Sequence, residues 1–266
     1  MLYSTLCNQG DWAFRWRSIA PAVLMIPAVI VALIDVQYFL DSHTYDQWWD
    51  LFAISFVVAG LGIRVWTTGH TPRRTSGRNT KSQVADSLNT RGIYSIVRNP
   101  LYLGNFVGAL GVILLLHSLW LTLYYVLAFA LYFERVILVE ERFLLRKFGD
   151  SYRQWAEKTP AFFPLILRKY QPDELPFCWR TVLRREYITV AMTVLLLFVM
   201  EVGEDTMIQG EIILDSRWLI IAAINGGMFL FFRVVSKRTR WLSKGWQVIY
   251  RKGKIVREGE DNRGHP

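Results

Sequence analysis

The strongest constraint on the fold is that the apolar residues of this chain are gathered into long stretches. Hydrophobic residues make up 52% of the 266 positions, and a helix needs about 20 apolar residues to cross a bilayer core of about 30 Å. Several stretches are shorter, so tilt or a thinned bilayer is required. We predict an all-α integral membrane protein with about six transmembrane helices, at Ser18–Leu40, Trp48–Trp66, Leu101–Leu116, Leu119–Phe133, Tyr187–Val202 and Trp218–Phe232.

The connections between these stretches alternate in charge. The segments Asp41–Asp50 and Glu201–Asp215 contain acids and no Lys or Arg, whereas Arg64–Arg98 is strongly basic. Basic connections stay on the cytoplasmic side of a membrane. A soluble helical protein fits the length alone, but this alternation argues against it. The pattern predicts that both termini are cytoplasmic, in the inner membrane if the source is bacterial.

The net charge of +9 has the same origin, and it also favours contact with anionic lipid headgroups. Because the basic residues flank apolar spans, a nucleic-acid partner is disfavoured. Cys7 and Cys178 lie far apart in sequence and lack ligand spacing, so neither a disulfide framework nor a metal site is predicted. The first apolar stretch lacks a clear cleavage site and is interpreted as a retained span. The oligomeric state is left open.

The apolar stretch from residue 101 to residue 133 is too long for one span. We predict two short helices that turn near His117 and Ser118, which places His117 far from a cytoplasmic site and gives it no catalytic role. Gly104 and Gly108 are spaced to let another helix approach closely. Arg64 is interpreted as a side chain that snorkels to the interface.

The chain is divided into three parts by these patterns. Residues 1–68 form an N-terminal transmembrane pair, residues 69–170 form a core, and residues 171–266 form a C-terminal pair with a basic tail. Within the core, residues 132–155 have a helical pattern that leaves the membrane, and Pro160 and Pro164 end it. We expect the loops of the chain to form a cytoplasmic cap that binds a cofactor.

Two segments of the core carry a recognisable signature. Residues 98–105 are Arg-Asn-Pro-Leu-Tyr-Leu-Gly-Asn; after the apolar hairpin, residues 140–144 are Glu-Glu-Arg-Phe-Leu and residues 148–152 are Phe-Gly-Asp-Ser-Tyr. The pair resembles the signature of the integral membrane methyltransferases typified by isoprenylcysteine carboxyl methyltransferase and the phospholipid methyltransferases. The resemblance covers roughly residues 90–164 and implies that S-adenosylmethionine is the methyl donor.

The resemblance also implies roles for individual residues. Glu140 or Glu141 would bind the donor amine, although without the motif they would be interpreted as a solvated helix face paired with Arg142 or Arg146. The family histidine is replaced by Asn99, which cannot titrate near neutral pH. The implied catalytic residues are Arg98, Asn99 and Glu141, and the implied donor-binding residues are Asn99, Pro100, Tyr102, Leu103, Gly104, Glu140, Glu141 and Tyr152.

The acceptor is predicted from the basic segment before the hairpin, which suits a phosphate or carboxylate. An anionic oxygen can attack without a general base, which fits Asn99. The segment Thr75–Lys81 is similar to that of family members that methylate the phosphate of lipid A, although the positive-inside rule alone also explains its charge. The predicted substrate-binding residues are Arg73, Arg74, Arg78, Arg91 and Arg98, with Arg98 equally compatible with marking the membrane interface.

Two other functions are compatible with the sequence. Sterol reductases share a related membrane fold and use NADPH, but the spacing of residues 140–152 favours a methyltransferase. A non-catalytic membrane scaffold is the third possibility, for which the only positive sign is the loss of the motif histidine. The leading prediction is a methyltransferase that acts on a membrane lipid or lipidated acceptor.

Overall fold

The computed structural model describes residues 2–17, 19–27, 30, 43–72, 75, 83, 85–164, 170–212, 214–239, 241–242, 248–251 and 254–257. These residues form a helical bundle, as predicted, followed by a short antiparallel pair of strands. The elements are α1 (Leu2–Trp16), α2 (Ala20–Leu24), α4 (His43–His70), the 3-10 helix η2 (Gly92–Ser95), α5 (Pro100–Leu114), α6 (Leu119–Phe148), α7 (Asp150–Lys158), α8 (Trp179–Gln209), α9 (Ser216–Arg238), β1 (Val248–Arg251) and β2 (Lys254–Arg257).

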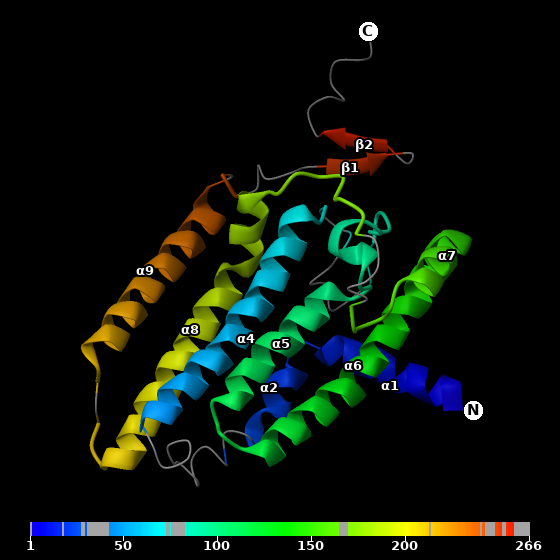
Figure 1. Cartoon of the computed structure of the whole chain (residues 1–266). Helices are drawn as coiled ribbons and strands as arrows, with labels where there is room; N and C mark the ends of the chain where they lie inside the picture. The colour runs from blue at the N-terminus through cyan, green and yellow to red at the C-terminus, as the bar shows by residue number, and fades with distance from the viewer. Residues whose placement is uncertain are drawn as a thin grey trace.

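Helices α9, α8, α4, α5 and α6 lie side by side in one inclined row (Figure 1). In the described part of the chain, four helices are long and apolar enough to cross a membrane: Tyr45–His70, Leu119–Phe148, Trp179–Ile208 and Ser216–Arg238. Their length and composition indicate a membrane protein. None of the residues of α9 is buried, which fits a helix that faces lipid.

The predicted count of six spans is only partly matched by these helices. Helix α5 has 15 residues, or roughly 22 Å of length, which is short for the hydrocarbon core. Most of the predicted span Ser18–Leu40 lies outside the described residues. Helix α1 was not predicted from the sequence; it packs along α6, where the Tyr132 hydroxyl donates to the Ala13 carbonyl at 2.5 Å.

The predicted hairpin is confirmed. Helix α5 ends at Leu114 and α6 begins at Leu119, so the turn contains His117, whose φ angle is positive at 51°. The Ser118 side chain caps α6 by accepting from the Leu121 amide. The helical pattern predicted for residues 132–155 is divided between two helices, because Gly149, with φ 54°, separates α6 from α7.

Glycines allow α4 and α5 to pack with their backbones in contact. A Cβ added to Gly60 would collide with the backbone nitrogen of Gly108 and lie 2.6 Å from the Gly104 carbonyl oxygen. One turn further along, a Cβ on Gly111 would lie 2.6 Å from the Ala53 carbonyl oxygen. The predicted close approach at Gly104 and Gly108 is therefore a contact with α4, which fixes the position of α5 in the bundle.

Arg64 joins three helices inside the bundle. Its Nε and Nη2 donate to Oε2 of Glu186 in α8, at 2.9 and 2.6 Å, and its Nη1 donates to Oδ1 of Asn105 in α5. The Arg64 side chain is 13% exposed and that of Glu186 only 3%. The interpretation of Arg64 as a snorkelling residue is therefore wrong, because its charge is paired within the protein.

The glycine contact generates a prediction about stability. Gly60→Ala should lower the free energy of unfolding by about 1–3 kcal/mol, since the methyl group forces the α4 and α5 backbones apart. Gly62→Ala is the matched control, because nothing lies within 4 Å of a Cβ at that position. Thermal unfolding in detergent measures both. Equal melting temperatures for the two variants would show that the backbone contact is not tight.

Candidate functional site

The two halves of the signature meet where α5 begins. Asn99 occupies the N-cap position of α5 and Pro100 its first turn, where a missing amide hydrogen and a fixed φ are tolerated. Pro100 is fully buried, which anchors this end. Residues 98–102 thereby lie against the end of α6 that carries Glu140 and Glu141.

Tyr102 contacts the first glutamate. Its hydroxyl donates to Oε1 of Glu140 at 2.9 Å, and its ring centroid lies 4.8 Å from that of Phe133. The positive charge of Arg17, after α1, acts on both Glu140 and Tyr102. No motif indicated Arg17, since only the packing of α1 on α6 brings it to this place.

Arg98 contacts the second glutamate. Its Nη2 lies 2.9 Å from Oε1 of Glu141, with the two side chains 17% and 27% exposed, and its Nη1 donates to the Ala156 carbonyl at 3.0 Å. Tyr152 of α7 is buried beside this pair. Burial, followed by the negative charge of Glu141, raises the pKa of the Tyr152 hydroxyl above its ordinary value.

The alternative interpretation of the glutamates, a solvated helix face paired with neighbouring arginines, does not describe these contacts. Arg142 instead pairs with Asp11 of α1, because its Nη2 donates to both carboxylate oxygens at 2.9 Å. Both glutamates face α5, where Tyr102 and Arg98 contact them. The structure therefore groups six of the predicted site residues: Arg98, Asn99, Tyr102, Glu140, Glu141 and Tyr152.

The chain after α7 returns to cover the start of α5. The Asn99 side-chain amide donates to the Ala161 carbonyl at 2.9 Å, and the Arg98 backbone amide donates to the Pro160 carbonyl at 2.9 Å. Phe162 then packs against Phe106, with ring centroids 5.5 Å apart. Asn99 thus has a structural partner here, which nothing in the motif indicated.

Two of the predicted donor-binding residues lie on another side of α5. Leu103 is buried, and a Cβ on Gly104 would meet the side chain of Arg64 and the carbonyl oxygen of Gly60. The structure places Gly104 in the contact with α4, away from the glutamates. A role for Leu103 and Gly104 in donor binding stays a prediction.

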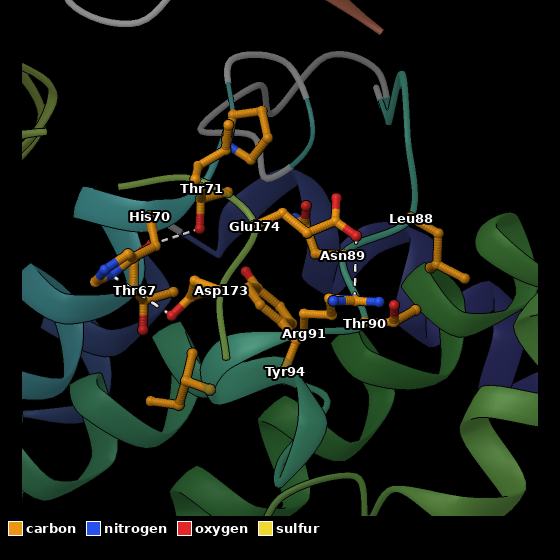
Figure 2. Close-up of a pocket in the computed structure, with 13 residues that line it drawn as sticks. Thr67, His70, Thr71, Leu88, Asn89, Thr90, Arg91, Tyr94, Asp173 and Glu174 are labelled. Atoms are coloured by element: carbon orange, nitrogen blue, oxygen red, sulfur yellow. Dashed lines mark hydrogen bonds and ion pairs between the residues drawn. The ribbon is translucent and has the colours of Figure 1, made fainter. Parts of the chain in front are cut away.

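A polar pocket of about 240 Å³ lies between the end of α4, η2 and residues 173–175. Figure 2 shows two ion pairs in it: Arg91 Nε lies 3.1 Å from Oε1 of Glu174, and His70 Nδ1 lies 3.8 Å from Oδ2 of Asp173. An apolar groove adjoins the pocket and shares one residue with it, Ile93; the groove is lined by Gly62, Ile63, Trp66, Ile93, Ile96 and Tyr170.

The predicted substrate-binding arginines are separated in the structure. Arg91 lines the polar pocket, whereas Arg98 belongs to the glutamate site. The positions of Arg73, Arg74 and Arg78 lie outside the described residues. Trp155 connects the two places, because its Nε1 donates to the carbonyl of Tyr94, a pocket residue, at 3.1 Å.

The opposite end of the bundle holds a second group of polar side chains. His117 lies there, as predicted, with its Nε2 3.4 Å from Oδ1 of Asp46 and 3.9 Å from Oδ1 of Asp50. No sequence pattern indicated this group, because it depends on the α5–α6 turn reaching the start of α4 from about 70 positions away in the chain.

Comparison with known proteins identifies the segment that carries the signature. Residues 49–151 match the family model of phospholipid methyltransferases. This segment of the chain is therefore similar to the phospholipid methyltransferases. This family segment contains most of α4, both helices of the hairpin and both glutamates, and it ends one residue before Tyr152.

Individual relatives share about half of the chain or less. The chain is 34% identical over 138 residues to the nickel-cobalt-cadmium resistance protein NccN of Alcaligenes xylosoxydans xylosoxydans, and 33% identical over 140 residues to the cobalt-zinc-cadmium resistance protein CzcN of Cupriavidus metallidurans. Each match covers 52% of this chain and 62% of the relative. Protein-S-isoprenylcysteine O-methyltransferase of Schizosaccharomyces pombe is 44% identical over 79 residues, which are 30% of this chain and 34% of that protein. No solved structure matches.

The contacts at the glutamate site generate a second stability prediction. Arg98→Gln should lower the free energy of unfolding by about 3 kcal/mol, because it leaves the largely buried carboxylate of Glu141 without its counter-charge. Arg153→Gln should cost less than about 1 kcal/mol, since its pair with Asp150 is exposed. Chemical or thermal unfolding measures both, and equal costs would contradict a buried ion pair at Arg98.

Proposed function

We propose that this protein transfers a methyl group from S-adenosylmethionine to an anionic oxygen of a membrane lipid or lipidated acceptor. One observation carries the proposal: two adjacent glutamates of α6 face the start of α5, where Tyr102 and Arg98 contact them. The match of residues 49–151 to the phospholipid methyltransferase model supports methyl transfer as the reaction. The identity of the donor is what the resemblance of the signature implies, and the acceptor is inferred from the chemistry of the basic residues.

The residues at this site fit the polar groups of the donor. The donor has a cationic amine, a carboxylate and an aromatic base. Glu140 and Glu141 offer carboxylates to the amine, and Arg98 offers guanidinium hydrogens to the carboxylate. Tyr102 and Phe133 provide aromatic surface beside the glutamates. Since both glutamates already have a partner within the protein, the donor amine adds to these contacts or replaces one of them.

The chemistry requires positioning more than proton transfer. When bound, S-adenosylmethionine would supply a methyl group on a positively charged sulfur that can leave with the bonding electrons. An anionic acceptor oxygen has a free electron pair, so no base must remove a proton. Asn99 therefore serves this reaction without titrating; it holds the segment after α7 over the site and helps to exclude water.

The acceptor is proposed to lie in the polar pocket with its chain in the adjoining groove. Arg91 is the described arginine of this pocket, and its side chain is 54% exposed, so an anion can reach it in exchange for Glu174. Trp66 and Ile63 would contact an acyl or prenyl chain. A lipid A phosphate is one acceptor of this class, which the similarity of residues 75–81 favours. The names of the metal-resistance relatives do not identify an acceptor.

Donor binding is tested by removing the two carboxylates. The double variant Glu140→Gln, Glu141→Gln should weaken binding of S-adenosylmethionine at least about 100-fold, because two charge-assisted contacts to the amine are lost. Equilibrium dialysis with the purified protein measures it. Glu134→Gln, an exposed position in the same helix, is the control and should bind normally. Unchanged affinity in the double variant would overturn the site assignment.

Acceptor binding is tested separately. Arg91→Gln should leave the affinity for S-adenosylmethionine unchanged and lower methyl transfer to the acceptor by about tenfold or more, since one charged contact to the anion is lost. Arg153→Gln, an exposed arginine of α7, controls for a general loss of positive charge. The measurement is donor dialysis beside radiolabelled transfer into lipid extracts. Normal transfer by Arg91→Gln would contradict the pocket as the acceptor site.

A further inference from the structure

We propose that Asp46, Asp50 and His117 form a binding site for one divalent transition-metal cation. The site joins the start of α4 to the α5–α6 turn. It lies at the end of the bundle opposite the glutamate site: Figure 1 shows the start of α4, the α5–α6 turn and the end of α8 together at the lower end. The proposed metal site does not depend on methyl transfer, so a negative result for either proposal does not affect the other.

The ligand atoms are already close enough to share an ion. One oxygen from each aspartate and one imidazole nitrogen all lie within 4.8 Å of one another, and His117 Nε2 is 3.4 Å from Oδ1 of Asp46. Ligands on a tetrahedral zinc ion lie about 2.0–2.2 Å from it, and therefore roughly 3.4 Å from one another. Small rotations of the Asp50 side chain, which is 26% exposed, would complete the geometry.

The local structure holds the three side chains in place. Asp46 and Asp50 are four residues apart in a helix, so their side chains lie on one face. His117 sits at the positive-φ position of the turn. Trp49 fastens the turn to α4, because its Nε1 donates to the Leu114 carbonyl at 2.7 Å, and its ring packs beside His117. Such supporting contacts orient the ligands of metal sites.

The surroundings add negative charge. Glu204 of α8 interacts electrostatically with both Asp46 and Asp50, and Glu201 interacts with Asp50. Oε1 of Glu204 is buried and has no hydrogen-bond partner in the described structure. The sequence places no Lys or Arg in segments 35–50, 115–120 and 201–215. Carboxylates held close together in a partly buried site repel one another, and a divalent cation removes that repulsion.

The ligand set selects the kind of cation. Imidazole nitrogen favours Zn²⁺, Co²⁺ or Ni²⁺ over Mg²⁺ and Ca²⁺, which prefer sites made only of oxygen. Two aspartates neutralise the charge of one divalent ion. Three protein ligands leave a fourth position for water. The class of ligand is therefore a divalent ion of the zinc, cobalt and nickel group.

The test is a titration of the full-length purified protein after removal of metals with a chelator. Co²⁺ is the probe, because its visible absorption reports a nitrogen and oxygen ligand set, and Zn²⁺ should displace it. Wild type should bind one Co²⁺ saturably. His117→Gln and Asp50→Asn should each weaken binding at least about tenfold. Glu211→Gln, an exposed acid of the neighbouring connection Glu201–Asp215, should bind like wild type.

Each outcome decides the proposal. Absence of saturable Co²⁺ binding by wild type would show that the three residues do not bind a metal ion. Wild-type affinity in both His117→Gln and Asp50→Asn would show the same. Thermal unfolding gives a second reading that needs no variant. Zn²⁺ should raise the melting temperature of wild type, since the ion ties α4 to the hairpin turn, and a chelator should reverse the rise.

Discussion

The ion pair between Arg64 and Glu186 is the interaction on which the arrangement of the helices depends. Glu186 lies outside the family segment, so this pair attaches α8 to the helices that carry the signature. The same guanidinium donates to Asn105, within the first half of the signature. Breaking a buried pair of this kind costs about 3–5 kcal/mol, because the remaining charge stays desolvated. The position of α5 is therefore fixed both by Arg64 and by backbone contact at Gly60.

A fixed α5 gives both ends of the hairpin a defined geometry. At one end, Arg98 and Tyr102 contact the adjacent glutamates of α6, and the chain after α7 closes over them through Asn99. At the other end, the turn brings His117 to the two aspartates of α4. One rigid helical pair thus carries two polar sites in a bundle whose outer surface is largely apolar.

The sequence predicted the features that depend on local pattern. Apolar stretches located the long helices, and the length of residues 101–133 required a turn near His117. The two halves of the motif indicated that Tyr102 and Arg98 lie near Glu140 and Glu141. The features it missed depend on contacts between distant segments. Arg17 acts on Glu140 only because α1 packs on α6, and Arg64 has a charged partner only because α8 lies beside α4. Neither contact leaves a periodic signal in the chain.

The most direct test of the central claim is transfer of radiolabelled methyl from S-adenosylmethionine into membrane lipid extracts by the purified protein. Alkaline treatment and chromatography then identify the labelled species. The account predicts label in an anionic lipid or lipidated acceptor, at a bond whose lability to base marks an oxygen ester. Absence of label across extracts of varied composition, together with no binding of the donor, would contradict it.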